Sequence, residues 1–289
     1  MFITRQPLKR LQSNNSNSLK SGFVGYFIFV AFCLSLTHSV KAEPWIDTRD
    51  AGLRVDIDRL SNAGIIKVPV NTYPLMWVGI INDLEASPKK ALPENLINSY
   101  TRTLAAGRKA TRIIRTYQSA SLSVANESQV LRHFGDQGRE EIELTFRRNA
   151  INNFSAYNLE ITKSVNPWDG EKTRYDNSYF AFVFGNWIGL AGSVEKWWGP
   201  SWNSSLILSN NARPTPGLTL QRNYSDSFNF PVLEWLGPWT TSMFMNQLDD
   251  ERVIDNAKLF GMTVGFRPTP ALEINLRRTA QWGGKGRPQ

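Results

Sequence analysis

From Tyr117 onward, apolar and polar residues alternate in segments that are long for β-strands. Ala120, Leu122 and Val124 alternate with serines, which gives one apolar and one polar face. The alternation recurs in about nine segments: 117–124, 142–147, 154–165, 178–187, 188–196, 217–224, 239–248, 258–267 and 272–282. Ordinary strands have about five to six residues, whereas a strand tilted across a bilayer needs about 9 to 11. The pattern therefore predicts a mainly β fold, an antiparallel transmembrane β-barrel over residues 116–289.

The connections between these segments differ between the two ends of the predicted strands. Residues 149–153, 185–186 and 267–270 read as tight turns, whereas residues 125–139, 166–177 and 249–256 are long, polar and charged. Short turns at one end and long loops at the other are typical of outer-membrane barrels. The aromatic residues near segment ends are candidates for interfacial girdles: Tyr117, Trp187, Trp239 and Trp282. A soluble β-sandwich also alternates and is the alternative fold.

Residues 1–42 have the pattern of a secretory signal peptide. Basic residues precede an apolar run over 23–36, and Val40-Lys41-Ala42 offers small residues where a signal peptidase cleaves. This run is shorter than the ~18 to 20 residues of a membrane-spanning helix. Five of the 33 basic residues and none of the 25 acidic ones lie in the segment, so its removal lowers the net charge from +8 to +3. We therefore expect export to the outer membrane and no binding of nucleic acid.

No metal or cofactor is predicted. Cys33, the only cysteine, lies in the apolar run behind Phe32, where a lipid-attachment site needs a small residue. The predicted mature chain therefore has no thiol chemistry, and His133 is its only histidine. We interpret His133 as a solvated loop residue. The sequence shows no glycine-rich phosphate loop, zinc-type cluster or nucleophile elbow.

Residues 43–115 have helical periodicity. Leu53, Ile57 and Leu60 fall on one face of a helix that follows Asp50 and ends at Gly64. A second helix begins at Pro74, and a third begins near Pro93. We predict a small helical domain on the periplasmic side of the barrel.

The segment from Gly192 to Pro216 is rich in tryptophan and in turn-forming residues. Aromatic faces beside a carboxylate and a guanidinium suit a sugar ring, which has apolar C–H faces and a rim of hydroxyls. The candidate polysaccharide-binding residues are therefore Glu195, Trp197, Trp198, Trp202 and Arg213. The alternative interpretation is structural, because large aromatic side chains bury much area. In that case the segment folds into the barrel lumen and Glu195 pairs with Arg213.

Four stretches of the sequence resemble the Wzi family of capsule assembly proteins. They are Pro74-Leu75-Met76-Trp77, Glu195-Lys196-Trp197-Trp198-Gly199-Pro200, Ser209-Asn210-Asn211-Ala212-Arg213-Pro214-Thr215-Pro216 and Gln281-Trp282-Gly283-Gly284. The resemblance covers nearly all of the predicted mature chain. It implies a non-enzymatic outer-membrane barrel with a helical periplasmic domain. Such a protein binds capsular or extracellular polysaccharide at the Gram-negative cell surface, amid outer-membrane lipid and other capsule export components.

The chain departs from that family in its length. Family members are longer and close a barrel of many more strands, so we expect a partial barrel that is truncated at its carboxyl end. About nine strands is also an odd number, whereas bacterial single-chain barrels have even numbers.

Two other functions remain open at this stage. A sugar- or lipid-processing barrel enzyme could use a carboxylate pair from among Asp169, Glu171, Glu195 and Glu234. A diffusion porin is the third hypothesis. Turnover that is lost on replacing one carboxylate would indicate the enzyme, and solute conductance without retention of capsule would indicate the porin.

Overall fold

The computed structural model describes residues 40–41, 44–87, 92–111, 113–114, 116–249 and 254–287. Almost all of the predicted signal peptide therefore lies outside the described residues. All of the described residues belong to one compact unit.

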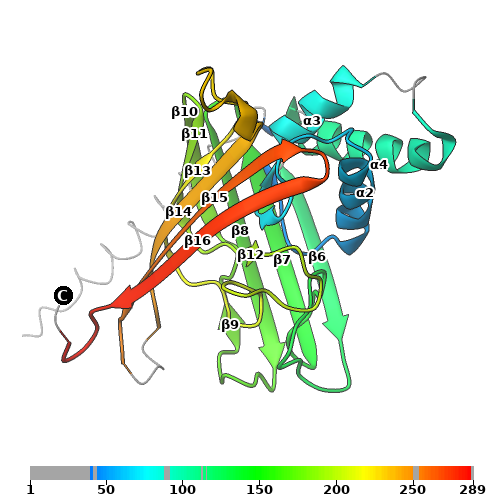
Figure 1. Ribbon diagram of the computed structural model, residues 1–289. Coiled ribbons are helices and arrows are strands. Elements are labelled where there is room, and N and C mark those ends of the chain that lie inside the picture. The colour runs from blue at the N-terminus through cyan, green and yellow to red at the C-terminus, as the bar shows by residue number, and fades with distance from the viewer. Residues whose placement is uncertain are drawn as a thin grey trace, which may run out of the picture. The chain divides into compact units, whose positions relative to one another are not determined.

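The long strands after residue 116 form one large antiparallel sheet (Figure 1). Along the sheet the neighbours are β16 (Leu272–Trp282), β15 (Lys258–Thr269), β14 (Trp239–Gln247), β13 (Gly217–Arg222), β11 (Trp187–Gly192), β10 (Tyr179–Phe184), β8 (Ser155–Val165), β7 (Ile142–Ile151) and β6 (Tyr117–Val124). The short β9 (Thr173–Arg174) pairs with β8. Long strands that are consecutive along the chain pair with one another, as in an up-and-down barrel wall. The predicted mainly β, antiparallel fold is confirmed, with nine strands along the described path.

Strand length agrees with the sequence pattern in part. Six of these nine strands have eight to twelve residues, but β10, β11 and β13 have only six each. The expectation of bilayer-length strands is therefore wrong for these three. Gly192, the last residue of β11, is the register partner of Gly217, the first residue of β13. The two strands therefore reach the same level of the sheet, and residues 193–216 leave the sheet there. Gly192 has φ 144, and a Cβ there would lie 2.3 Å from the Ser178 carbonyl oxygen.

The two faces of the sheet have opposite polarity. On β10, Phe180, Phe182 and Phe184 point outward and are about half exposed. On β7, outward Leu144 and Phe146 alternate with inward Glu143, Thr145 and Arg147. We call the two sides the outer face and the inner face. An apolar outer face and a polar inner face are what an outer-membrane barrel wall presents.

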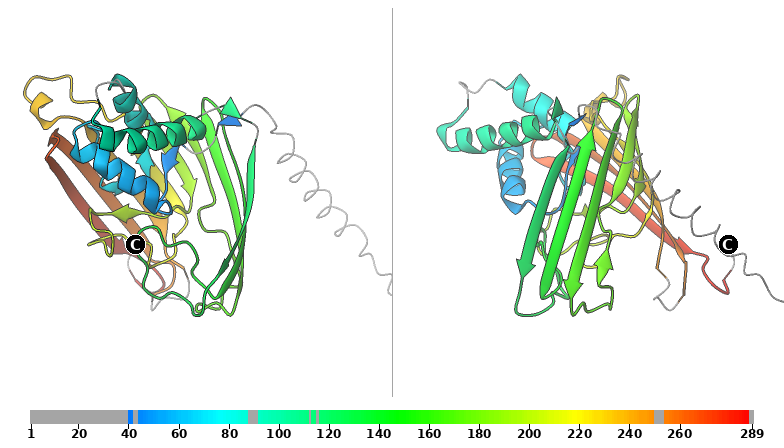
Figure 2. Two further views of the ribbon diagram at one scale, coloured as in Figure 1. Left: turned by 90° about the vertical axis from the view of Figure 1, so that its right-hand side faces the viewer. Right: turned by 180° about the vertical axis from the view of Figure 1, so that it is seen from behind.

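Three helices lie beside one end of the strands (Figures 1 and 2). Helix α2 (Ala51–Asn62) follows Asp50 as predicted, because the Asp50 side chain accepts a hydrogen bond from the Leu53 backbone N–H at 2.8 Å. Helix α4 (Glu94–Ala110) begins directly after Pro93, also as predicted. Helix α3 (Trp77–Ala86) begins three residues later than Pro74, because β4 (Leu75–Met76) first pairs with β2 (Trp45–Ile46). No described helix is long and apolar enough to cross a membrane.

The helices share one core with residues from much later in the chain. Ile57, Leu60 and Ile80 pack in the same cluster as Phe134 and Trp197. The last of these helices ends at Ala110 and the first long strand begins at Tyr117. A division into separate domains at residue 115 stays a prediction, since the helices are packed on the connections of the sheet.

The connections follow the predicted asymmetry with one exception. Residues 152–154, 185–186 and 270–271 form tight turns at the end of the sheet where the helices lie. Long connections at the other end include residues 125–141 and 166–178, the second of which contains β9. Residues 223–238, which carry the short helix η2 (Glu234–Leu236), form a long connection on the side of the tight turns. The expectation of only short turns on that side is wrong here.

We expect Asp50→Ala to lower the free energy of unfolding by about 1 kcal/mol, because α2 loses its side-chain cap. Denaturant titration of the folded chain measures this. Asp50→Asn is the matched control, since it keeps an oxygen that can accept from Leu53. Equal stability of Asp50→Ala and the parent chain would contradict a role for the cap.

Candidate functional site

Residues 193–216, which we call the inner segment, run along the inner face of the sheet. Its only described strand is β12 (Trp197–Trp198), which pairs with β3 (Thr72–Tyr73). The side chains of Trp197 and Trp198 are both fully buried. Trp197 packs edge-on against Phe134 at 5.7 Å, and Trp198 packs against Phe244 of β14 at 5.6 Å between ring centroids. The geometry therefore supports the structural interpretation of these two rings, because neither has a free face for a sugar.

Trp202 lies in an aromatic cluster that packs around an arginine side chain of α2. The Arg54 guanidinium lies 4.5 Å from the Trp202 ring and 4.2 Å from the Phe134 ring. It also donates a hydrogen bond to the Pro200 carbonyl at 2.7 Å. Trp202 itself is half-buried. Arg54 thus fastens the turn of the inner segment to the helices through cation–π contacts and a charged hydrogen bond.

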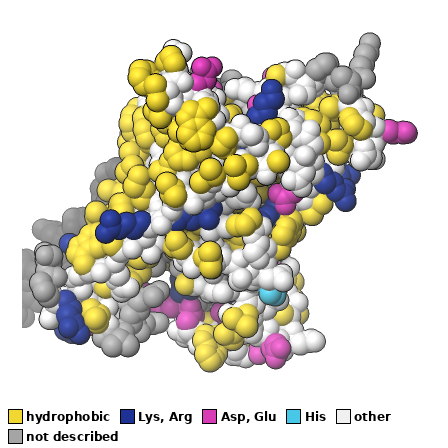
Figure 3. All heavy atoms as spheres, in the orientation of Figure 1, with side chains coloured by type: hydrophobic (Ala, Val, Ile, Leu, Met, Phe, Trp, Pro, Cys, Tyr) yellow, Lys and Arg dark blue, Asp and Glu magenta, His cyan; other side chains and the backbone are white. Residues whose placement is uncertain are grey.

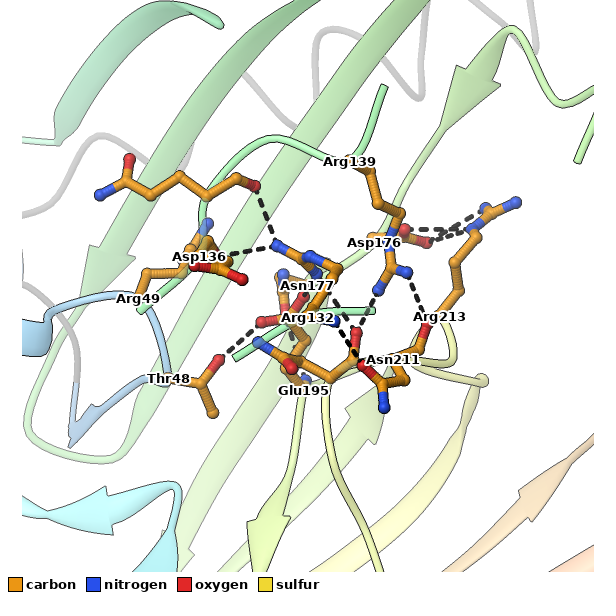
Figure 4. A network of polar contacts seen from close by, with 12 residues as sticks. Thr48, Arg49, Arg132, Asp136, Arg139, Asp176, Asn177, Glu195, Asn211 and Arg213 are labelled. Carbon is orange, nitrogen blue, oxygen red and sulfur yellow. Dashed lines mark hydrogen bonds and ion pairs between the residues drawn. The ribbon is translucent and has the colours of Figure 1, made fainter. Parts of the chain in front are cut away.

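The Glu195 side chain is only 9% exposed and is bound by residues from three other parts of the chain (Figure 4). Its Oε2 accepts a hydrogen bond from the Thr48 hydroxyl at 2.6 Å, and Arg132 Nη1 lies 3.6 Å from its Oε1. Its backbone N–H donates to the Asn177 side chain at 3.0 Å. The carboxylate therefore holds the inner segment in place.

Arg213 does not pair with Glu195. Its guanidinium binds Asp176 at 3.1 Å instead (Figure 4). It also binds Asp169 at 3.1 Å, and the Arg213 side chain is 30% exposed. The expected Glu195–Arg213 pair is therefore wrong, although the expected burial of Glu195 in the lumen is found. Sequence reasoning missed the true partners because they lie on the connection that contains β9.

Two arginines of the 125–141 connection bind the backbone of the inner segment. Arg139 donates to the carbonyl oxygens of Asn210 and Asn211, both at 2.7 Å, and Arg132 donates to the Asn210 carbonyl at 3.3 Å. Burial lowers the pKa of the Arg139 guanidinium to about 10. Each guanidinium offers several N–H donors, so it can bind backbone carbonyl groups that form no hydrogen bond to a neighbouring strand. No periodicity marks these two arginines in the sequence.

The wall strands add a second set of ion pairs. Glu160 on β8 is bound by Arg147 of β7 at 2.8 Å and by Arg49 at 3.0 Å. Arg174 of β9 binds Glu140 and Glu143 in a buried group. Glu143 and Arg147 lie at inward positions of β7, and Glu160 lies at an inward position of β8. The alternation of apolar and polar residues along these strands is the only sequence signal that could have predicted them.

Two cavities lie beside this network. The larger has a volume of about 730 Å³, and its lining includes Trp45, Trp77, Tyr117, Arg49, Lys109 and Arg147. The smaller has about 190 Å³ and is lined by charged residues, among them Arg132, Arg139, Glu160 and Glu195. Arg49, Gln137 and Arg147 line both. The larger cavity combines aromatic side chains with cationic and amide donors, which is the chemistry that a sugar ring needs.

The remaining predicted residues lie apart from one another. His133 is exposed, as expected, and its Nδ1 lies 3.1 Å from the Asn203 carbonyl oxygen. Asp169 binds Arg213, Glu195 binds Thr48, and Glu234 lies in η2. Asp169, Glu195 and Glu234 thus lie in different parts of the fold, whereas the fourth candidate, Glu171, lies beside Asp169 and donates its backbone N–H to the Asp169 carboxylate at 3.0 Å. Among the described residues, no group of three or more histidine, cysteine, aspartate or glutamate side chains could hold a metal ion.

Comparison with known proteins gives one family and two relatives. Residues 112–289 match the family described as capsule assembly protein Wzi. An uncharacterized 55.8 kDa protein from the cps region of Klebsiella pneumoniae is 27% identical over 271 residues, which are 90% of this chain and 52% of that protein.

The solved structure of Wzi from Escherichia coli has a similar fold, with a TM-score of 0.72 at 24% identity. The alignment covers 84% of this chain and 54% of that one. That protein is described as an outer-membrane, carbohydrate-binding β-barrel involved in group 1 capsule assembly. The present chain thus spans about half the length of both relatives.

We expect Trp198→Ala to lower the free energy of unfolding by about 3 to 5 kcal/mol, because it leaves a cavity between β12 and β14. The heat-modifiable gel shift and denaturant titration measure this loss. Trp168→Ala is the matched control, since Trp168 is 75% exposed. Similar losses for the two variants would contradict the core role of Trp198.

Lys196 predicts a pH dependence of stability. Its ammonium lies 4.6 Å from the Phe244 ring centroid, and burial lowers the pKa of Lys196 from 10.5 to about 8. Between these pKa values the unfolded chain binds more protons than the folded one, so stability rises with pH by up to about 1.4 kcal/mol per unit. Lys196→Met should lose this rise between pH 8 and 10.5. Equal pH profiles of the parent and the variant in denaturant titrations would contradict it.

Proposed function

Because the chain belongs to the Wzi family of capsule assembly proteins, we propose that it is an outer-membrane protein that binds capsular or extracellular polysaccharide and helps to hold it at the cell surface. The single observation that carries the proposal is the family match over residues 112–289, which include the whole main sheet. The signal peptide over residues 1–42 and cooperation with other capsule export components belong to the same proposal.

The polarity of the sheet supports a position in the membrane. Leu122, Phe182 and Leu218 lie on the outer face and are 67%, 48% and 67% exposed. An outward apolar surface on neighbouring strands is costly in water and favourable in lipid. The inward polar positions are covered by the inner segment and the helices. A soluble sandwich would pack its apolar face against a second sheet, and the main sheet has no such partner in the described residues.

The filled inner face supports binding over diffusion. The inner segment is fixed to the connection over residues 125–141 through Arg132 and Arg139, to β14 through Trp198, and to the helices through Arg54. A diffusion porin needs a continuous water-filled channel. The ordered segment on the inner face leaves local cavities for a ligand, so it favours a binding protein.

The larger cavity is the proposed contact site for the polymer. Its volume of about 730 Å³ is within the range of about 300 to 1,000 Å³ that is usual for ligand sites. The Tyr117 ring is 46% exposed and can stack on a sugar, while Lys109, Arg49 and Arg147 offer donors to hydroxyl or carboxylate groups. Weak contacts to each sugar unit add up along a polymer that has repeats.

The five residues expected from the sequence then have two roles. Trp197, Trp198 and Glu195 hold the inner segment, and this segment shapes the smaller cavity. Arg213 and Trp202 retain more solvent exposure, so direct contact with the polymer is proposed for these two among the five, outside the larger cavity, which neither of them lines. Asp169, Glu195 and Glu234 lie in different parts of the fold, and Glu171 beside Asp169 is exposed, which gives no support to a carboxylate pair of the glycosidase type.

We expect Tyr117→Ala to weaken binding of purified capsular polysaccharide about five-fold, since one aromatic stacking contact contributes roughly 1 kcal/mol. Calorimetry on the folded chain in detergent measures the affinity, and the heat-modifiable gel shift checks folding. Tyr224→Ala is the matched control, because Tyr224 is similarly exposed at 39% and lies outside the cavity. Unchanged binding by a folded Tyr117→Ala variant would remove the cavity from the proposal.

A further inference from the structure

The long connection over residues 223–238 folds back over the outer face of the sheet. Trp239 and Phe266 are register partners at outward positions of β14 and β15. Phe228 stacks on the Trp239 ring at 4.7 Å with an interplanar angle of 7°, and lies 6.5 Å from the Phe266 ring. Phe228 therefore fixes the connection on the side of the sheet that faces away from the inner segment.

Two further contacts fix the shape of this connection. The Arg222 guanidinium lies 3.9 Å from the Trp239 ring centroid and donates to the Asp226 carbonyl at 3.0 Å. Gly237 has φ 68, and a Cβ there would lie 2.2 Å from the Arg267 carbonyl oxygen. The connection is thus seated on the ends of β13, β14 and β15 rather than extended into solvent.

The other side of the connection is apolar and exposed. Phe230, Val232 and Trp235 are 57%, 66% and 66% exposed, and Leu233 is 37% exposed. Figure 3 shows apolar side chains gathered at this end of the molecule, where Figure 1 draws the connection. Four large apolar side chains within six positions need a partner other than water.

We propose that residues 223–238 anchor the protein in the lipid leaflet on the helical side, with Phe230, Val232 and Trp235 inserted at the boundary between phospholipid headgroups and acyl chains. The inference rests on the proposed membrane position of the sheet. The exposed side chains continue the outer face at the level where the strands end, which is where a barrel leaves the bilayer. Tryptophan and other aromatic side chains are enriched at that boundary, because one part of the ring is apolar and another can meet water.

Of the girdle expected from the sequence, this assignment keeps Trp239, whereas Tyr117 lines the larger cavity instead. Trp239 lies at the same boundary. Phe228 stacks on its ring, so Trp239 itself is only partly exposed. Phe154, in the tight turn between β7 and β8 at the same end, is 76% exposed and adds a second aromatic side chain at this level. The exposed contacts with lipid therefore come from connections between strands as well as from strand ends.

The test places a fluorophore at one position at a time in the full chain. Trp235→Cys is compared with Phe182→Cys on the outer face of β10 and with Leu206→Cys on the inner segment, where Leu206 is 99% exposed. Cys33→Ser removes the native thiol from all three. Each labelled chain is reconstituted in vesicles of phosphatidylethanolamine and phosphatidylglycerol. Quenching is measured with aqueous iodide, with nitroxides high on the acyl chain and with nitroxides near its end.

We expect the label at position 235 to lose most of its intensity to the shallow nitroxide and little to iodide. The label at 182 should be quenched by both nitroxides, and the label at 206 by iodide alone. Val232→Cys gives a second measurement at the same surface. A label at 235 that behaves like the one at 206, beside a lipid-quenched label at 182, overturns the anchor and leaves the proposed function intact.

Two other outcomes also overturn the anchor. Protection from iodide at 235 without nitroxide quenching, together with cross-links between two chains at this position, would assign the surface to a second copy. A label at 182 that no lipid nitroxide quenches would remove the membrane position itself, and with it the proposed function.

Discussion

The hydrogen bonds from Arg132 and Arg139 to the carbonyls of Asn210 and Asn211 are the interaction on which the interior depends. A segment without regular strands or helices carries backbone oxygens that must find donors when it is buried. A guanidinium offers five donors in a fixed plane, so two arginines can satisfy several carbonyls at once. With Glu195 bound to Thr48, they hold the inner segment to the connection over residues 125–141 and to the residues just before α2. The buried positions of Trp197 and Trp198 follow from this attachment.

The same arrangement explains why a tryptophan-rich segment is not itself the exposed surface for a sugar. Trp197 and Trp198 fill the space between the helices and β14, and their burial stabilises the inner segment. The space that remains lies nearer the first strands, beside Tyr117 and Arg147. Arg49 and Arg147 there already have a partner within the protein, since both bind Glu160. A ligand would therefore meet a site that is ordered before it binds, which lowers the entropic cost of binding.

The outer face differs, since many of its apolar side chains are exposed and no second sheet covers it among the described residues. Lipid is the solvent that such a surface requires. The connection over residues 223–238 extends this apolar surface beyond the strand ends, because Phe228 packs on Trp239 while Phe230 and Trp235 point away from the sheet. The sheet thus separates two environments, with ion pairs on one side and aromatic side chains on the other.

The sequence by itself determined the features that depend on local periodicity. Alternation located the long strands, and it separated outward Phe146 from inward Arg147, because successive residues of a strand point to opposite faces. Asp50 and Pro93 marked two helix starts, since capping and the fixed φ of proline act over one turn.

Only the tertiary structure decided the partners of Glu195 and Arg213, the burial of Trp198, and the fold of residues 223–238 over the sheet. Glu195 meets Thr48 and Arg132 across large distances in the chain, and no local pattern encodes such contacts. The physical reason is that burial and ion pairing depend on which segments the register of the sheet brings together, and that register is set by the whole sheet.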